Sequence, residues 1–230
     1  MNVTRTPRRI ARAGRTAYRQ VKYRTRHSTH PDQCATEGPS WPSVEFFKTT
    51  DSKVAAEIGT YRGDTAEQFA RILAERGGVL HIFDFQDRVG AVVQRLAAQG
   101  LANVVPHGNT YRTLDSYNWS LMEMLRDNSE PIFDYVMIDG AHTWHHDGFA
   151  FLLADRLLRP EGYVEFHDYD WTLAGSPTMN PSQFPATRRF YSEDQIGAEQ
   201  VRLIVDLLVR RDPCYEEIVP DRIFRKHRSA

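Results

Sequence analysis

Residues 54–64 read VAAEIGTYRGD, and this stretch decides the fold. Its first five residues, Val54–Ile58, are mostly apolar and have the length of a strand that is buried on both faces. Gly59 then breaks the run, and a helical pattern begins at Asp64. A glycine at such a turn lets the backbone come close to a ligand at the carboxyl edge of a sheet. The stretch therefore predicts the first strand, turn and helix of a nucleotide-binding α/β sheet.

The same alternation of short apolar runs and helical stretches continues as far as residue 168. Asp64 precedes Glu67 by three residues, which is the spacing of a capping box, so we expect Asp64 to cap the first helix. Strands that alternate with helices in this way predict a Rossmann-like, doubly wound and mostly parallel sheet. We expect further strands at Leu80–Asp84, Asn103–Pro106, Tyr135–Asp139 and Tyr163–Asp168, and helices at Thr65–Arg76, Val89–Ala98, Leu114–Arg126 and Gly148–Leu158.

The pattern changes after the fifth expected strand. Residues 172–189 carry three prolines among small polar residues and show no periodicity. Such a stretch predicts a long loop, and its place beside the carboxyl edge suggests a substrate lid. A helix at Glu193–Arg211 and an antiparallel hairpin of Tyr215–Val219 with Ile223–Lys226 are expected to complete the sheet.

The composition is that of a globular protein, because 41% of the 230 residues are hydrophobic and 26% are charged. These values argue against a disordered, collagen-like or coiled-coil chain. The longest apolar stretches are too short to span a bilayer, and the N-terminal residues lack the apolar segment of a secretory signal. Two cysteines, Cys34 and Cys214, are too few for a disulfide framework, so we expect a cytoplasmic protein.

The net charge of −1 conceals an uneven distribution. Residues 1–31 hold nine Arg and Lys and no acidic residue, which leaves 20 basic and 30 acidic residues in the remainder. We therefore predict a basic arm over residues 1–35 and a folded, acidic domain over residues 36–230. Residues 5–26 of the arm can bind an anionic membrane surface, pack on a sister subunit of a homo-oligomer, or remain a solvated tail. The acidic domain argues against nucleic acid as a partner.

Residues at the ends of the first two expected strands predict a nucleotide site. Asp84 follows Gly63 by 21 residues, which suits a carboxylate that accepts hydrogen bonds from ribose hydroxyls. Tyr61 stands where a dinucleotide fingerprint has its second glycine, and Glu57 would repel a phosphate. Both residues argue against a pyrophosphate and favour a ligand that carries positive charge.

Acidic and histidine side chains end the fourth and fifth expected strands. Asp139 ends the fourth, His167 and Asp168 end the fifth, and Asp170 follows closely. We expect these side chains to converge, because the carboxyl ends of parallel strands meet at one edge of a sheet. Carboxylates held together repel each other unless a cation lies between them, and oxygen ligands favour Mg²⁺ or Mn²⁺. The sequence thus predicts a divalent metal site.

With these residues in place, the chain resembles the class I S-adenosylmethionine-dependent methyltransferases. The matching residues are Glu57-Ile58-Gly59 through Gly63, followed by Asp84 on the second strand. The resemblance implies that S-adenosylmethionine is the cofactor. It also implies that the turn with Glu57, Gly59, Tyr61 and Gly63 contacts the methionine part and that Asp84 holds the ribose. Asn109, which follows the third strand, would border the adenine.

Two further motifs make the resemblance narrower. Residues 138–142 read IDGAH, and His167-Asp168 ends the fifth strand. Together they are similar to metal-dependent O-methyltransferases of natural-product sugars, a group related to rhamnosyl O-methyltransferases and cephalosporin-hydroxylase-like proteins. The resemblance implies methyl transfer to a hydroxyl of a sugar or glycosylated metabolite, with Asp139 and Asp168 on the metal and His142 as general base. His167 stands where the group has an acid, which shifts the expected metal toward Mn²⁺ or Fe²⁺.

Three other interpretations remain open at this point. A histidine beside two carboxylates can hold Fe²⁺, so an oxidase or hydroxylase on the same fold is the first. A non-catalytic scaffold that acts through the basic arm is the second. The third is a zinc site of His142, His145 and His146 with Asp147, although His145 and His146 are expected to begin a helix and face solvent.

Overall fold

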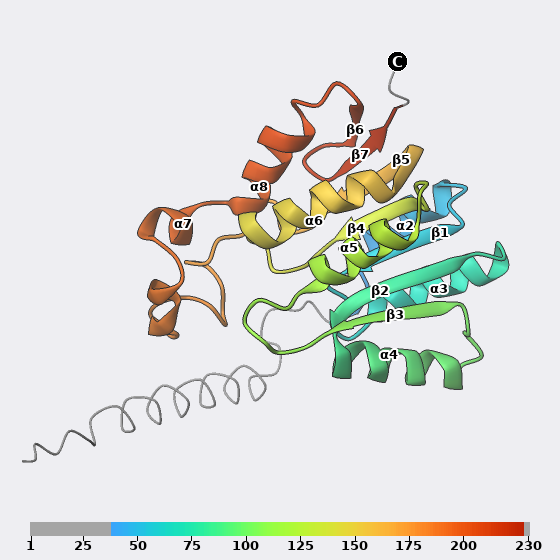
Figure 1. Cartoon of the computed structure of the whole chain (residues 1–230), viewed down its shortest axis with the longest axis horizontal. Coiled ribbons are helices and arrows are strands. Elements are labelled where there is room, and N and C mark those ends of the chain that lie inside the picture. Colours follow the sequence, from blue (N-terminus) through green and yellow to red (C-terminus); the bar gives the residue numbers. More distant parts are fainter. Residues whose placement is uncertain (1–37, 228–230) are drawn as a thin grey trace, which may run out of the picture. The chain divides into compact units, whose positions relative to one another are not determined.

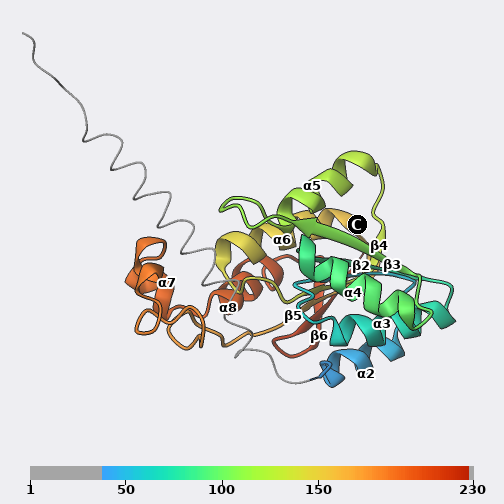
Figure 2. The same cartoon turned by 90° about the horizontal axis from the view of Figure 1, so that it is seen from below.

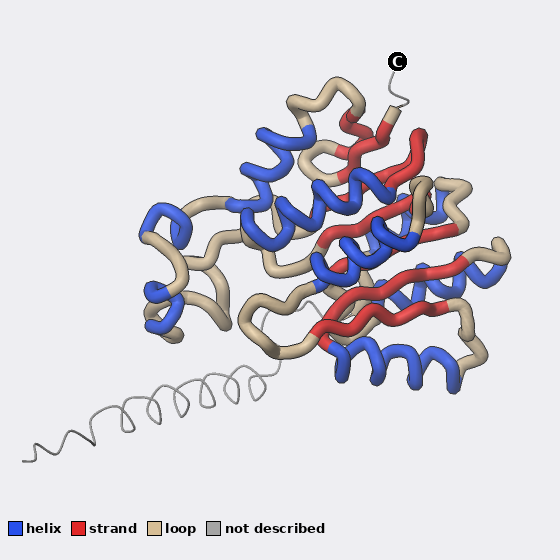
Figure 3. Tube along the Cα trace, viewed as in Figure 1, coloured by secondary structure: helices blue, strands red, loops and turns tan. Residues whose placement is uncertain are grey.

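The computed structural model describes residues 38–227, and in this part of the chain seven strands form one sheet (Figures 1 and 3). The strand order is β3-β2-β1-β4-β5-β7-β6. The first five strands of that order are parallel, whereas β7 runs antiparallel to both β5 and β6. The strands are β1 Val54–Ile58, β2 Val79–Phe85, β3 Val104–Asn109, β4 Phe133–Ile138, β5 Leu158–Phe166, β6 Tyr215–Val219 and β7 Ile223–Lys226.

Helices cover both faces of the sheet, and Figure 2 shows α3 and α4 on one side and α5 and α6 on the other. Strand β1 serves both layers, because Ala55 packs with the first group of helices and Ala56 with the second. The helices are α2 Trp41–Thr49, α3 Asp64–Glu75, α4 Gln86–Ala98, α5 Tyr117–Asp127, α6 Trp144–Leu157, α7 Glu193–Gly197 and α8 Gln200–Ile204, with a 3₁₀ turn η1 at Pro185–Arg189 and a π turn η2 at Val205–Val209.

The predicted doubly wound sheet with a C-terminal antiparallel hairpin is therefore confirmed. Its central strands carry near-continuous apolar runs because both of their faces are covered. Strand β3 continues past the expected end at Pro106 to Asn109. It tolerates this proline because it is an edge strand with one unpaired side. None of the helices in residues 38–227 is both long and apolar enough to cross a membrane.

Two local predictions were wrong. The capping residue of α3 is Gly63, in the left-handed region at φ +74°, so Asp64 lies inside the first turn and caps nothing. The single helix expected over residues 193–211 is broken, because Ala198 is extended. The amide of Gln200 explains the break, since its nitrogen donates to the carbonyl of Gln195 (2.7 Å) and its oxygen accepts from the backbone of Trp144 (2.8 Å). Both groups are thereby satisfied without helical hydrogen bonds.

Residues 172–189 form a loop that contains only η1, and this segment lies to one side of the sheet in both views (Figures 1 and 2). Thr187 is fully buried there and donates a hydrogen bond to the carbonyl of Met179 (2.7 Å). The loop starts shortly after the carboxyl end of β5. The predicted arm over residues 1–35, including the segment 5–26, lies outside the described residues.

A buried carboxylate joins α2 to the sheet. Glu165 of β5 is fully buried and accepts hydrogen bonds from the hydroxyls of Tyr135 and Ser43 and from Nε of Arg222 (2.6 Å). Burial alone would raise the pKa of Glu165, but hydrogen bonding and the charges of His167 and Arg222 lower it to about 2. Helix α2, which has Pro42 in its first turn, is therefore attached to β5 and to the turn before β7 by polar contacts as well as by packing.

Acid is expected to destabilise the protein through Glu165. A carboxyl whose folded pKa is depressed contributes stability above its unfolded pKa and loses it as the pH falls through the folded value. For Glu165 the window runs from roughly pH 4.3 down to about 2, and the contribution is about 3 kcal/mol. Urea unfolding across this window should show a steeper loss of stability in the wild type than in Glu165→Gln. Equal slopes would show that Glu165 does not carry the effect.

Candidate active site

The loops that follow β1 and β4 touch at the carboxyl edge of the sheet. Gly59 has φ +90°, and a Cβ placed on it would lie 1.9 Å from the carbonyl oxygen of Asp139. Only glycine fits this backbone conformation and this close approach. Gly59 is also fixed to the neighbouring strand, because its N–H donates to the carbonyl of Phe83 (2.8 Å). The predicted glycine turn thus holds the start of the IDGAH segment in place.

The residues predicted to bind the cofactor lie along the ends of β1, β2 and β3. Asp84 is nearly buried and accepts a hydrogen bond from the backbone N–H of Tyr61 (2.8 Å) through Oδ2. Tyr61 itself has φ +50°, so this contact holds a strained turn. Asn109 is also buried and lies opposite Phe85 in the pairing of β2 with β3. The structure therefore groups the turn, Asp84 and Asn109 at one edge.

Glu57 is buried in this region with one carboxyl oxygen unpaired among the described residues. The residue is 2% exposed, and its Oε2 has no hydrogen-bond partner among the described residues. Burial raises the pKa of Glu57 well above its ordinary value, and the nearby carboxylates of Asp139 and Asp84 raise it further. A buried carboxyl without a partner favours a ligand that brings positive charge or a hydrogen-bond donor. Glu57 therefore suits the cationic ligand that the sequence predicts.

Asp139, His142 and Asp168 come together at the ends of β4 and β5. One potential ligand atom from each of the three lies within 4.8 Å of the others. Nε2 of His142 is 3.3 Å from Oδ2 of Asp168 and 3.9 Å from Oδ1 of Asp139. Among the residues that the structure describes, neither carboxylate forms an ion pair with an arginine or lysine. The cluster thus carries excess negative charge, which a divalent cation would compensate.

The direction of the pKa shift of Asp139 agrees with this grouping of negative charges. Enclosure by the protein raises the pKa of Asp139, the charges of His167 and His142 lower it, and the carboxylate of Asp168 raises it again. Asp170, which was expected to join the cluster, does not. Its side chain is 72% exposed and forms an ion pair with Arg202. The chain turns away after Asp168, whose φ is +58°.

The backbone of the IDGAH segment is held by Asp147, whose role the sequence analysis missed. This carboxylate is buried in the first turn of α6 and accepts hydrogen bonds from the N–H of His142 (2.7 Å) and of Ala141 (3.1 Å). The hydroxyl of Tyr117 also donates to it. These contacts stabilise His142 at φ +54°, where few residues other than glycine are found. The DGAHxxxxD spacing of the sequence is the signal that could have revealed this contact.

His167 lies on the other side of Asp139. Its Nδ1 is 3.7 Å from Oδ2 of Asp139, while its Nε2 faces Glu165 (3.1 Å), Ser43 (3.0 Å) and Arg222 (3.1 Å). It does not belong to the group of three whose ligand atoms lie within 4.8 Å of one another. The structure thus brings the predicted metal ligands Asp139 and Asp168 together with His142, and places the predicted ligand His167 behind Asp139.

The amino-acid sequence adds evidence to the strand order and the site geometry, because it matches a protein family. A family model described as a methyltransferase domain matches residues 56–169, from β1 to the residue after Asp168. Residues 56–169 are a methyltransferase domain, and the fold is that of the class I S-adenosylmethionine-dependent methyltransferases. A search of curated proteins found no match to the sequence.

Solved structures of methyltransferases share this fold. The O-methyltransferase TomG from Streptomyces achromogenes, involved in tomaymycin synthesis and solved with S-adenosylmethionine, is 19% identical, with 88% of this chain and 85% of that chain covered and a TM-score of 0.56. An O-methyltransferase from Bacillus cereus, solved with S-adenosylhomocysteine, is 15% identical at coverages of 90% and 88% and a TM-score of 0.58. The Podospora anserina methyltransferase PaMTH1, also with S-adenosylhomocysteine, is 15% identical over 100% of both chains, with a TM-score of 0.57.

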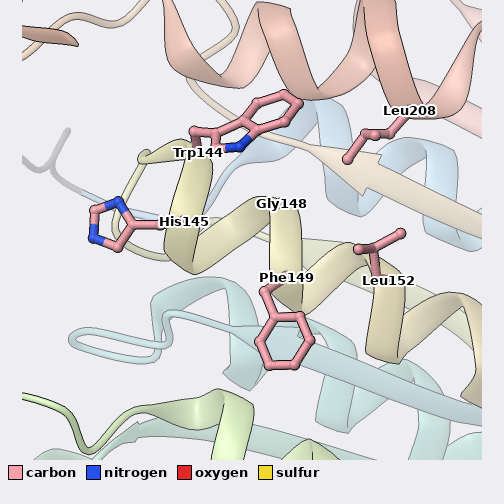
Figure 4. Close-up of a pocket in the computed structure, with 6 residues that line it drawn as sticks. All are labelled: Trp144, His145, Gly148, Phe149, Leu152 and Leu208. Atoms are coloured by element: carbon pink, nitrogen blue, oxygen red, sulfur yellow. The ribbon is translucent and has the colours of Figure 1, made fainter.

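The zinc site proposed for the histidines of this methyltransferase finds no support in the described residues, where Asp139, His142 and Asp168 are the group that could hold a metal. His145 is exposed, as expected, but His146 is partly buried and contacts Thr143 through Nδ1 (3.1 Å). Figure 4 shows His145 on an apolar groove of α6 with Trp144, Phe149, Leu152 and Leu208. No residue of the acidic cluster lines that groove, so it is a separate feature.

Replacing Asp84 is expected to weaken cofactor binding by the methyltransferase. Its carboxylate supports the Tyr61 turn and is the acceptor proposed for the ribose hydroxyls. Hydrogen bonds to a charged group contribute roughly 1.5–3 kcal/mol, so Asp84→Ala should raise the Kd for S-adenosylhomocysteine about 10- to 100-fold. Isothermal titration measures the change, and Asp127→Ala, at an exposed acid that ends α5, is the control. An unchanged Kd would place the ribose elsewhere.

Proposed function

We propose that this methyltransferase transfers a methyl group from S-adenosylmethionine to a hydroxyl of a sugar or glycosylated metabolite, with the help of a divalent metal ion. The observation that carries the proposal is the grouping of Asp139, His142 and Asp168 beside Gly59 and Glu57, at the edge where the fold family binds its cofactor. TomG, which acts in the synthesis of a natural product, supports a small-molecule acceptor.

The cofactor fits the residues at the ends of the first three strands. Glu57 would face the ammonium or sulfonium charge of the methionine part, because its Oε2 is buried and has no other partner in the described residues. Gly59 and Gly63 both have left-handed backbones and shape the turn that would face the methionine part. Asp84 would accept hydrogen bonds from the ribose, and Asn109 would border the adenine. Tyr61 would lie along the methionine part.

The metal fits the acidic cluster. Asp139 and Asp168 would hold the ion, since both lack an arginine or lysine partner in residues 38–227 and lie within reach of one another. Carboxylate oxygens suit Mg²⁺ and Mn²⁺, and the adjacent imidazoles make the site tolerant of Mn²⁺ or Fe²⁺. A bound divalent ion lowers the pKa of an acceptor hydroxyl and fixes its direction.

His142 is the general base in this proposal. A base must lie within hydrogen-bond reach of the proton that it removes, and Nε2 of His142 is 3.3 Å from the Asp168 carboxylate. The cofactor would supply the methyl group and leave as S-adenosylhomocysteine, and His142 would take the proton of the acceptor hydroxyl. The products are the methyl ether and S-adenosylhomocysteine. The ring of Trp171 lies 5.1 Å from that of His142 and offers an apolar face to a sugar ring.

The oxidative alternative is less well supported. It places His167 beside two carboxylates at one point, but His167 is not in the group of three whose ligand atoms lie within 4.8 Å of one another, and its Nε2 is engaged with Glu165 and Arg222. The membership of the methyltransferase family also argues against a scaffold without catalytic activity. Homo-oligomer formation and membrane contact through residues 5–26 remain proposals for the arm.

Calorimetric titration of the metal-stripped full chain tests the proposal. S-adenosylmethionine and S-adenosylhomocysteine should bind with micromolar affinity, and Mg²⁺, Mn²⁺ and Fe²⁺ should then be compared as activators of methyl transfer to a panel of glycosides. Binding of the cofactor with methyl transfer that survives chelation would reject the metal. Metal binding without cofactor binding, together with O₂-dependent turnover, would favour the oxidative alternative.

A further inference from the structure

A chain of polar contacts runs from the interior of the protein to Asp139. It begins at Glu165, which is fully buried between β4 and β7. The hydroxyls of Tyr135 and Ser43 and the guanidinium of Arg222 all donate to this carboxylate, so its position is fixed from three elements. Residues that share a fully satisfied buried network lose the freedom to rotate.

The network also fixes the orientation of the His167 ring. Nε2 lies within hydrogen-bond distance of an oxygen of Glu165 (3.1 Å), of the Ser43 hydroxyl (3.0 Å) and of Arg222, which can only donate (3.1 Å). A protonated Nε2 donates to Glu165, whereas an unprotonated Nε2 accepts from Arg222 or Ser43 and leaves the ring proton on Nδ1, so the ring keeps one orientation in either form. The other ring nitrogen, Nδ1, then faces Oδ2 of Asp139 at 3.7 Å. The imidazole side chain is 15% exposed, so little space remains for another rotamer.

We propose that His167 is a positioning residue, which Glu165 orients and which in turn holds the Asp139 carboxylate toward Asp168 and His142. The inference rests on the proposed metal site. Ligands of a metal are commonly held by a second layer of hydrogen bonds, and removing such a partner weakens metal affinity about 10- to 100-fold. The proposal gives His167 a role other than that of a metal ligand. An imidazole suits this position because it contacts two carboxylates, Glu165 and Asp139.

The affinity for Mn²⁺ and the electron paramagnetic resonance spectrum of bound Mn²⁺ test the proposal without an assay of turnover. The wild type and His167→Gln are stripped of metal, titrated with Mn²⁺, and examined by spin-echo modulation, which detects directly coordinated nitrogen. We expect His167→Gln to weaken Mn²⁺ binding about 10- to 100-fold and to lose no nitrogen coupling. The control is His145→Gln, which removes an exposed imidazole from α6 and should leave the affinity unchanged.

Three results would overturn the inference. Loss of a nitrogen coupling in His167→Gln would make His167 a ligand. Unchanged Mn²⁺ affinity would remove it from the site. Absence of Mn²⁺ binding in the wild type would reject the metal site of the proposed function, and S-adenosylhomocysteine titration of the same sample would show whether the cofactor site stands without it.

If His167→Gln does not fold, a second variant tests the proposal. Ser43→Ala removes one hydroxyl that contacts both Glu165 and Nε2 of His167 and leaves every charged group in place. We expect it to weaken Mn²⁺ binding about 10-fold, which is the lower end of the range for such partners. Wild-type affinity in a folded Ser43→Ala protein, as judged by circular dichroism, would contradict the proposal.

Discussion

Asp139→Asn is expected to reduce kcat/KM for methyl transfer by at least about 10³-fold. Asp139 lies at the centre of the site, with His142 and Asp168 on one side and His167 on the other. A metal ion that polarises a reacting oxygen contributes several kcal/mol to stabilisation of the transition state, and each ~1.4 kcal/mol corresponds to a factor of ten. The amide keeps the size of the side chain but removes its charge, so both metal binding and turnover should fall.

Asp170→Asn is the matched control for this experiment. Asp170 follows Asp168 by two residues, but it is exposed and paired with Arg202. Its replacement should leave kcat/KM within about twofold, since a surface ion pair contributes little. Rate measurements over a range of Mn²⁺ concentrations separate weak metal binding from a slow chemical step. Full activity of Asp139→Asn at any metal concentration would exclude this carboxylate from the reaction.

The strand ends were predictable from sequence because a parallel sheet places them together. Short apolar runs indicate buried strands, and the residues that follow each run meet at one edge. This reasoning found Glu57, Asp84, Asp139 and Asp168 although up to 111 positions separate them. The motif of residues 138–142 added His142. None of these predictions needed a side-chain contact to be known in advance.

The contacts behind the site were not predictable in this way. Ser43 lies 122 residues from Glu165, and Arg222 lies 57 residues beyond it, in the turn before β7. Glu165 stands between Val164 and Phe166 near the end of β5, and an acidic residue between two apolar neighbours carries no signal about its partners. Helix α2 escaped notice because its nine residues are short and its apolar face is interrupted by polar residues. The sequence therefore indicated which residues reach the edge but could not show what holds them there.

Helix boundaries show the same limit. The expected range of α6 was Gly148–Leu158, although His145 and His146 were also expected to begin a helix, and the helix begins at Trp144. The difference matters, because it puts Asp147 in the first turn, where its carboxylate reaches the N–H groups of Ala141 and His142. A negative side chain in the first turn is also favoured by the helix dipole. One tertiary contact thus sets both the start of the helix and the conformation of the proposed base.

His142→Ala is expected to lower kcat about 10²- to 10⁴-fold and to leave Mn²⁺ bound. The position of His142 makes the second part of this expectation informative, because its Nε2 lies close enough to both carboxylates to act as a ligand instead. If His142 removes the proton, Asp139 and Asp168 retain the ion and only the chemical step slows.

His145→Ala is the control, since its imidazole is exposed on α6 and lies outside the acidic cluster. Mn²⁺ titration and single-turnover rates of the same His142→Ala preparation distinguish the two roles. Loss of Mn²⁺ binding in step with activity, with recovery at high Mn²⁺, would assign His142 to the metal rather than to the proton. Retained binding with a rate that no Mn²⁺ concentration restores would leave proton removal as its role, and would mean that two carboxylates and the acceptor suffice to hold the ion.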